Sequence, residues 1–384
     1  MFNFKLLNPI VSAAKMLPKT PSANHLATNN ASLSLSPLAT DDIIHWALKK
    51  HHDASFPHPR GAAKPITKRP RLLKSPAIAL LCGLICVLLA LSSCSSRPVI
   101  KLAVSPWLGA ELNAWVAKLV MERELGLTAE LVKVNETAQW ERVSKGEIHA
   151  SLEVWPTGRA REIDHYIKET RTVENLGLLG VVGKIGWYVT PDLARQFPLA
   201  VPWQILRDPM VIKALKADPA DHDGVFLAGA PSWVQNDAAI IKNLGLNLRV
   251  RRLGSEEQLV AAVKRACREH TPLLFYFWSP HPLLAQCPVR QVKLPDFSPD
   301  CYARKGPQGI ECDYPPEVLI KIAWKGLEPY SPKAHAFLRN FSYTSREQLN
   351  LMGLVSNRGL PPREAALAWI EKHPRVWKPW LPVD

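Results

Sequence analysis

Four tryptophans lie at the ends of predicted strands, where their indole side chains could bind a ligand. They are Trp107, Trp155, Trp233 and Trp278. The strands that they end or follow are predicted over residues 99–104, 148–155, 224–230 and 273–278. Because ligands of open α/β sheets bind just beyond the carboxyl ends of the strands, we expect the four indoles to line one shared pocket. The alternative for each is an ordinary core position, since large aromatic side chains dominate protein cores.

A pocket walled by indoles suits a cation with a diffuse charge and no hydrogen-bond donor, as in a quaternary ammonium ion. Cation–π attraction to a Trp face contributes about 0.5 to 2 kcal/mol per desolvated contact, and choline is bound in this way. A dissociation constant of about 1 μM needs about 8 kcal/mol, which three or four such walls could approach at the upper end of this range. The aromatic pattern therefore predicts a small quaternary ammonium ligand.

The elements that must position these residues follow an α/β pattern, in which short apolar strands alternate with longer amphipathic helices. About 290 residues follow Cys94, more than one core normally covers. Further strands are predicted over residues 129–134 and 248–253, and helices over 108–125, 137–145, 234–244 and 255–270. Ser255 is a predicted N-cap, and Thr344 with Glu347 a predicted capping box. Pro361 and Pro362 are expected to open the last long helix.

Five short segments contain most of these aromatic residues and follow one another along the chain. They are Trp107-Leu108-Gly109, Leu152-Glu153-Val154-Trp155-Pro156-Thr157, Gly186-Trp187-Tyr188-Val189, Gly229-Ala230-Pro231-Ser232-Trp233 and Trp278-Ser279-Pro280-His281. In this order the chain from about residue 98 to 384 resembles the glycine betaine/choline/proline substrate-binding proteins of ABC transporters. The Trp-Pro-Thr and Trp-Ser-Pro-His segments are the most specific parts of the match.

The resemblance implies a periplasmic-binding-protein fold of the type II-like class, with two α/β lobes and the ligand between them. The first lobe would span residues 98–186 and 292–384, and the second lobe residues 187–291. The chain would cross between the lobes twice, over Gly183 to Thr190 and over Val289 to Pro295. Closure of the lobes would then complete the pocket.

The same resemblance implies roles for single residues. The family's aromatic cage falls on the four tryptophans, and its contact with a ligand carboxylate falls on His281. Tyr276, Trp187 and Glu153 lie near these segments and are further candidates for ligand contact, each able to retune specificity.

Two of these candidates have open alternatives. Glu153 shares a strand face with Trp155, so it would either face the cleft or be solvated at a strand edge. In the cleft it would repel the carboxylate of glycine betaine and favour choline. His281 would either contact the ligand or cap a helix that begins at Pro282. Pro282 and Leu283 stand where many family members have another Trp, so the resemblance does not say which residue forms that side of the pocket.

Cys94 ends a sequence typical of a bacterial lipoprotein signal. An apolar run over residues 77–91 has the length of a signal-peptide core and is too short to span a bilayer comfortably. The preceding basic residues are Arg69, Arg71 and Lys74. We expect a signal peptide over residues 66–93 that is cut before Cys94, with a lipid anchor of more than one acyl chain on that cysteine. The alternative is a signal anchor that is never cut.

Residues 1–65 precede this signal, although a signal peptide normally starts a chain. They mix Ser, Pro, Asn and His with few aromatic residues, and they cannot bury enough surface to offset chain entropy, so we expect disorder. Either translation starts later or the leader is unusual. A later start would need another initiation codon, because no Met lies between Met16 and Met121.

Four cysteines follow Cys94, and in an exported protein four cysteines indicate two disulfides with three possible pairings. Cys301 with Cys312 is the favoured pair, because the residues between them are rich in turn formers. Cys267 with Cys287 then follows by elimination. No Cys-x-x-Cys and no nearby His pair supports a zinc site.

Charge and motifs exclude several other classes of protein. The chain has 48 Lys and Arg residues and 34 Asp and Glu residues. Of these, 11 basic and 3 acidic residues precede Cys94, so the part after Cys94 has 37 basic and 31 acidic residues and a net charge of +6. The densest basic cluster, Arg249, Arg251 and Arg252, alternates along a predicted strand, so we expect no nucleic-acid partner. Because nucleotide-binding, nucleophile-elbow and metal-helix motifs are missing, we expect no catalytic residue, metal or cofactor.

We therefore predict an exported, lipid-anchored receptor that faces the periplasm or the cell exterior. It would capture a quaternary ammonium compatible solute and deliver it to an ABC permease and its ATPase. Two rival classes stay open: an exported enzyme on the same scaffold and a ligand-sensing domain, because a fold does not fix a function. The sequence does not decide among glycine betaine, choline, proline betaine and carnitine, nor which membrane holds the anchor.

Overall fold

The computed structural model describes residues 98–195, 201–233, 235–304 and 309–383, all within one compact unit that spans Leu84–Asp384. The predicted leader, the signal peptide and Cys94 lie outside the described residues. Among the helices that the structure describes, none is both long and apolar enough to cross a membrane.

The strands and helices alternate along the chain as follows. The strands are β1 (Val99–Val104), β2 (Thr128–Lys133), β3 (Ala150–Val154), β4 (Val173–Val189), β5 (Val201–Pro202), β6 (Gly224–Ala228), β7 (Leu248–Arg252), β8 (Leu274–Ser279), β9 (Arg290–Lys293) and β10 (Pro316–Trp324). The helices of seven or more residues are α3 (Leu108–Glu124), α4 (Ala138–Ser144), η2 (Ile163–Glu169), α8 (Asp237–Asn243), α9 (Glu256–Arg268), α13 (Pro332–Asn340), α14 (Ser345–Ser356) and α15 (Pro362–Lys372). The shorter helices are η1 (Thr157–Arg159), α5 (Ala160–Glu162), α6 (Pro191–Ala194), η3 (Trp203–Arg207), α7 (Pro209–Ala214), α10 (Leu283–Gln286), α11 (Pro299–Ala303), α12 (Leu327–Tyr330), α16 (Pro374–Trp377) and η5 (Lys378–Trp380).

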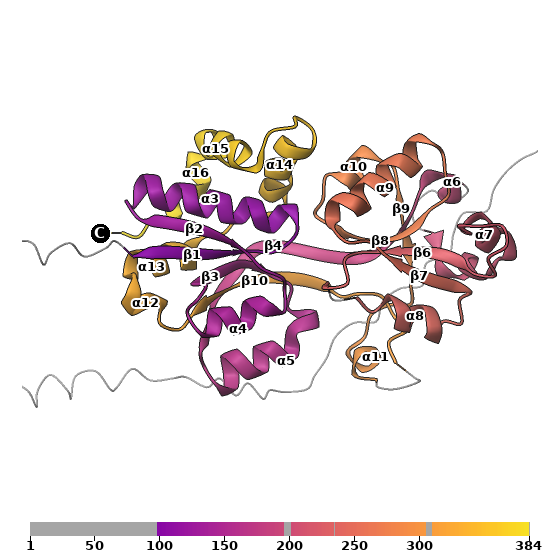
Figure 1. Ribbon diagram of the computed structural model, residues 1–384, viewed down its shortest axis with the longest axis horizontal. Coiled ribbons are helices and arrows are strands. Elements are labelled where there is room, and N and C mark those ends of the chain that lie inside the picture. Colours follow the sequence, from indigo (N-terminus) through magenta and orange to yellow (C-terminus); the bar gives the residue numbers. More distant parts are fainter. Residues whose placement is uncertain (1–97, 196–200, 234, 305–308, 384) are drawn as a thin grey trace, which may run out of the picture. The chain divides into compact units, whose positions relative to one another are not determined.

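One sheet runs through the described residues in the order β2-β1-β3-β10-β4-β8-β6-β7, and β9 pairs with β4 and β5 (Figure 1). Parallel pairing joins β1 to β2 and β3, and β6 to β7 and β8. The long strand β4 is shared by both halves of this sheet. Its residues 173–184 pair with β10, and its residues 184–189 pair with β8. A single continuous strand therefore connects the two halves.

Each half of the sheet has its own hydrophobic core, with helices on both faces (Figure 1). The first core cluster packs α3, α13, α14 and α15 against β1, β3, β10 and the first part of β4. The second core cluster packs α8 and α9 against β6, β8, β9 and the last part of β4. A smaller cluster around Trp140 lies between α4 and the strands of the first half. The two clusters bring the carboxyl ends of β1, β3 and β8 toward one another.

The predicted elements agree with the structure to within a few residues. The strand expected over 99–104 is β1, and the helix expected over 108–125 is α3. Ser255 caps α9 by accepting a hydrogen bond from Gln258 N, and Thr344 with Glu347 forms the predicted capping box of α14. The helix expected over 234–244 begins at Asp237.

The predicted second crossing differs from the structure. Val289, Val292 and Leu294 belong to the second core cluster, and β9 pairs with the last part of β4. The chain enters the first half of the sheet again only at β10. The reason is that Ile310 and Tyr314, which follow α11, still pack on the second core cluster, a long-range contact that local pattern does not reveal. The predicted first crossing, residues 183–190, falls where the pairing of β4 passes from β10 to β8.

Candidate ligand-binding site

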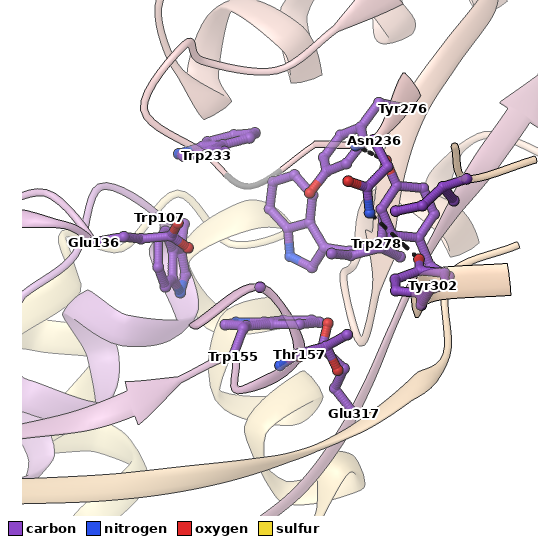
Figure 2. Close-up of a pocket in the computed structure, with 14 residues that line it drawn as sticks. Trp107, Glu136, Trp155, Thr157, Trp233, Asn236, Tyr276, Trp278, Tyr302 and Glu317 are labelled. Atoms are coloured by element: carbon purple, nitrogen blue, oxygen red, sulfur yellow. Dashed lines mark hydrogen bonds between the residues drawn. The ribbon is translucent and has the colours of Figure 1, made fainter. Parts of the chain in front are cut away.

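A cavity of about 300 Å³ lies where the residues of the two core clusters face each other (Figure 2). Its walls combine large aromatic side chains with a few polar groups, as in most small-molecule sites. The residues that line it are Trp107, Glu136, Trp155, Thr157, Gly158, Ile185, Trp233, Asn236, Tyr276, Trp278, Tyr302, Ile310, Tyr314 and Glu317. The structure thus brings the four predicted tryptophans and Tyr276 to one cavity.

The indoles come from both halves of the sheet. Trp107 is the N-cap residue of α3 and Trp155 follows β3, whereas Trp278 lies in β8. Figure 2 shows Trp107 and Trp155 on one side of the cavity and Trp233, Tyr276 and Trp278 on the other. Trp233 and Trp278 meet edge to face, with ring centroids 5.1 Å apart and an interplanar angle of 86°. Walls from both halves would enclose a compact ligand.

Two glycines allow the indoles to lie directly on the backbone. A Cβ atom at Gly183 would overlap the ring of Trp155, and one at Gly229 would overlap the ring of Trp233. Any larger residue at either position would push its indole into the cavity or out of the cage.

Glu153 lies behind the cage and does not line the cavity, which corrects its predicted place in the cleft. Its side chain is buried and accepts four hydrogen bonds. The donors are Trp107 Nε1 at 2.6 Å, Trp155 Nε1 at 3.2 Å, Asn113 Nδ2 at 2.7 Å and Gln348 Nε2 at 2.9 Å. The prediction assumed that side chains on β3 alternate between the cleft and a second face, as Trp155 and Glu153 share one face. It was wrong because β3 is buried on both faces and has no solvated side. Glu153 instead fixes the orientation of two cage indoles.

The environment of Glu153 favours its neutral form. Burial raises the pKa of this carboxyl group to about 7, although the four donors oppose that rise.

The prediction that Trp187 contacts the ligand is also wrong, because Trp187 is a core residue. Its side chain is fully buried in β4, where it packs on Phe226 with ring centroids 4.7 Å apart. Its Nε1 donates to Asp237 Oδ1 at 2.7 Å, and Tyr314 of the cavity wall donates to the same oxygen at 2.8 Å. Burial raises the pKa of Asp237 to about 6. Trp187 therefore lies behind the wall formed by Tyr314.

His281 is buried behind Trp278 rather than exposed in the cavity. Its Nδ1 accepts a hydrogen bond from the backbone N–H of Leu283 at 3.0 Å, at the start of α10. This is the helix-capping alternative. Since Nδ1 accepts, the ring proton is on Nε2, which lies 2.8 Å from Glu256 Oε1. Both ring nitrogens therefore have protein partners.

Two carboxylates that the sequence analysis did not select line the cavity. Glu317, at the start of β10, accepts a hydrogen bond from Thr157 N at 2.8 Å. Burial raises the pKa of Glu317, and the nearby charge of Glu136 raises it further. Glu136 accepts a hydrogen bond from the buried guanidinium of Arg159. No Lys, Arg or His is among the described residues that line the cavity.

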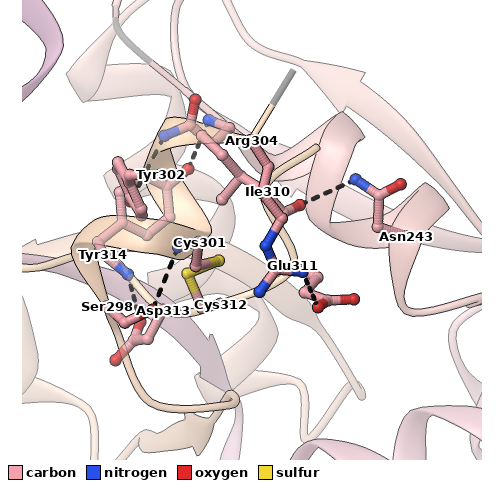
Figure 3. The surroundings of a disulfide bond; sticks show 11 residues. Asn243, Ser298, Cys301, Tyr302, Arg304, Ile310, Glu311, Cys312, Asp313 and Tyr314 are labelled. Carbon is pink, nitrogen blue, oxygen red and sulfur yellow. Dashed lines mark hydrogen bonds and ion pairs between the residues drawn. A yellow bond between two sulfur atoms is a disulfide. The ribbon is translucent and has the colours of Figure 1, made fainter. Parts of the chain in front are cut away.

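The remaining wall comes from a segment held by a disulfide (Figure 3). The Cys301–Cys312 bond brackets Tyr302 and Ile310, and Tyr314 follows directly. Asn243 Nδ2 donates to the carbonyl of Ile310 at 3.1 Å and ties the segment to α8. The structure thus contains the predicted Cys301–Cys312 pair, and it also joins Cys267 to Cys287.

Comparison with known proteins identifies the family. Residues 98–372 match the model of the substrate-binding domain of ABC-type glycine betaine transport systems. The chain belongs to this family. Its members are transport binding proteins that act outside the cytoplasm.

Similar proteins are distant in sequence. The glycine betaine/carnitine transport binding protein GbuC of Listeria monocytogenes serotype 1/2a (strain 10403S) is 25% identical over 126 residues, which cover 33% of this chain and 37% of that protein. The chain therefore spans little more than a third of that relative's length in the match.

Solved structures of ABC-transporter binding proteins share the fold. An ABC-transporter choline-binding protein with choline bound superposes with a TM-score of 0.58 at 18% identity, over 73% of this chain and 91% of that one. The glycine betaine, L-proline binding protein ProX of Borrelia burgdorferi superposes with a TM-score of 0.58 at 18% identity, over 74% of this chain and 97% of that one. Lactococcal OpuAC, in its closed form with glycine betaine bound, superposes with a TM-score of 0.55 at 20% identity, over 74% of this chain and 99% of that one. The protein thus has the two-lobed periplasmic-binding-protein fold.

Proposed function

We propose that this protein captures a small quaternary ammonium compound in the cavity and delivers it to an ABC permease. The observation that carries the proposal is the cage itself: four indoles from both halves of the sheet face one cavity that also contains two carboxylates. An ammonium ion with methyl groups loses little hydration on entering such a site and gains cation–π attraction from each ring face.

The affinity expected from the cage reaches the micromolar range at its upper limit. Four indole faces at about 0.5 to 2 kcal/mol each give about 2 to 8 kcal/mol, and about 8 kcal/mol corresponds to a dissociation constant of about 1 μM. The two glutamates add favourable long-range interaction with the cation, and the buried position of the rings limits screening by salt.

Family membership supports the delivery step. The receptor would dock on a permease driven by an ATPase, and a lipid on Cys94 would hold it at the membrane surface after export. We assign the two lobes to the two core clusters, with residues 292–304 and 309–314 in the second lobe instead of the first. In this proposal the chain is a receptor and not an enzyme.

Isothermal titration calorimetry of the full chain tests the proposal. Choline and glycine betaine are titrated into the wild type, Trp155→Ala and Trp278→Ala, with Trp203→Ala as a control because Trp203 lies in η3, outside the cavity. We expect micromolar binding of a quaternary amine that is lost in both cage variants and retained in the control. Wild-type protein that binds neither amine would refute the proposal.

A further inference from the structure

Glu256 is a buried carboxylate that contacts both halves of the sheet. It is the first residue of α9, which packs in the second core cluster, and only 5% of its surface is exposed. Its Oε2 accepts a hydrogen bond from the backbone N–H of Leu108 at 2.6 Å. Leu108 is the first residue of α3, which packs in the first core cluster. This hydrogen bond therefore joins the two halves.

The N-terminus of α3 lacks a capping side chain of its own. Its N-cap residue is Trp107, and an indole has no oxygen to accept a hydrogen bond. Glu256 supplies the missing acceptor from the other half, where the positive end of the helix dipole favours its negative charge. Charge-assisted hydrogen bonds of this kind are about twice as strong as neutral ones.

His281 holds the same carboxylate from within the second half. The other oxygen of Glu256, Oε1, lies 2.8 Å from His281 Nε2. The imidazole also meets the indole of Trp278, with ring centroids 5.4 Å apart and an interplanar angle of 74°. Since Trp107 directly precedes Leu108, the carboxylate lies behind one cage wall from each half.

Separation of the two halves would break only one of these two contacts. The strand β4 is shared by both halves, and its pairing passes from β10 to β8 at Lys184. A rotation about this strand would move α3 away from α9, because the two helices belong to different core clusters. Glu256 would then keep His281 and lose the N–H of Leu108. The hydrogen bond to Leu108 therefore forms only when the halves are in contact.

We propose that Glu256 is a latch, a positioning residue that holds the two halves of the sheet together over the cavity. It does not line the cavity, so it acts on binding through the closed arrangement that places the cage walls of the two halves opposite each other (Figure 2). The apparent affinity for a ligand is reduced by the fraction of protein that is in the binding-competent conformation. The latch thus goes beyond the function proposed above: it sets affinity without contact with the ligand.

Stopped-flow fluorescence and calorimetry of the full chain with choline test the latch. In Glu256→Ala the dissociation constant should rise by about tenfold or more, because the closed form alone loses a hydrogen bond to a charged group. The rise should come from faster dissociation at an unchanged association rate, since the cavity walls stay intact. Glu257→Gln, at the exposed neighbour on α9, should leave both rates within about twofold. Misfolding would instead lower the number of binding sites and leave the rates unchanged.

A second variant removes the donor in place of the acceptor. Proline is tolerated at the first position of a helix, and Trp107, with φ −152° and ψ 153°, already has the extended backbone that suits a residue before proline. Leu108→Pro should therefore keep α3 and lose the N–H, whereas the control Leu108→Ala keeps the N–H. Leu108→Pro should speed dissociation more than Leu108→Ala does, and this difference should disappear in the Glu256→Ala background. An unchanged dissociation rate in Glu256→Ala, or a difference that persists in its background, would overturn the latch.

The outcomes separate the latch from the proposed function. Wild-type protein that binds neither choline nor glycine betaine overturns the proposed function alone. Small-angle X-ray scattering of the ligand-free full chain then decides on the latch: Glu256→Ala should have a larger radius of gyration than wild type, and Glu257→Gln should not. Equal radii for wild type and Glu256→Ala would in that case overturn the latch.

Discussion

Replacing Glu153 tests how the cage is held. In Glu153→Leu, the indole N–H groups of Trp107 and Trp155 lose their acceptor, whereas Asn113 and Gln348 can bond to each other, as they already do at 3.4 Å. Each buried donor left unpaired costs about 1 to 3 kcal/mol, so the free energy of unfolding should fall by about 2 to 6 kcal/mol.

The same variant should weaken ligand binding. Two cage walls lose their fixed orientation, and immobilising each again costs about 0.5 to 1.5 kcal/mol on binding. The dissociation constant for choline should therefore rise about 5- to 150-fold. Calorimetry gives the affinity and urea unfolding gives the stability.

Glu153→Gln is the matched control. Its amide oxygen can accept from both indoles, as Oε1 of Glu153 does now, and the amides of Asn113 and Gln348 can turn to accept from its NH₂ group. The affinity for choline should stay within about threefold of wild type. If Glu153→Gln lost as much affinity as Glu153→Leu, Glu153 would act on the ligand through its charge and the positioning role would be refuted. Wild-type affinity in a folded Glu153→Leu would refute it as well.

Three further predictions follow from the contacts around the cavity. Trp187→Phe removes the donor to buried Asp237, so the free energy of unfolding should fall by about 1 to 3 kcal/mol, while the affinity for choline stays close to wild type by calorimetry. Removing the Cys301–Cys312 disulfide by a double Cys→Ser replacement should cost about 2 to 3 kcal/mol of stability on the chain-entropy model. It should also weaken choline binding, because this segment supplies one wall; wild-type affinity in the double variant would count against that wall. The pKa of Glu153 is raised by burial from 4.5 to about 7, so its stabilising contribution is complete below pH 4.5 and is lost as the pH rises through about 7. Urea unfolding should therefore show wild type losing up to about 3 kcal/mol relative to Glu153→Gln between pH 5 and pH 8, and parallel pH profiles would contradict this.

Local sequence signals predicted the elements and the aromatic walls. Trp107 and Trp155 follow strands whose apolar runs are short and bounded by turn residues, so the rule for ligand sites at strand ends applied to them directly. The same rule would have found Glu136, which lies three residues after β2 ends at Lys133.

The polar half of the site depends on contacts that sequence separation hides. Glu317 enters the cavity because β10 runs antiparallel to β4, and Thr157, its hydrogen-bond partner, lies 160 residues away. Glu256 reaches Leu108 across 148 residues with one carboxylate oxygen, and its other oxygen lies 2.8 Å from His281 Nε2. Neither propensity nor periodicity encodes such pairs. The family resemblance therefore predicted that His281 contacts the ligand, whereas its tertiary partner Glu256 holds it behind the cage.

A crystal structure of the full chain grown with choline tests the central claim most directly. The account predicts the ammonium nitrogen within about 6 Å of the ring centroids of Trp107, Trp155, Trp233 and Trp278. Choline bound elsewhere on the protein, or an empty cage at a choline concentration that saturates binding in solution, would contradict it.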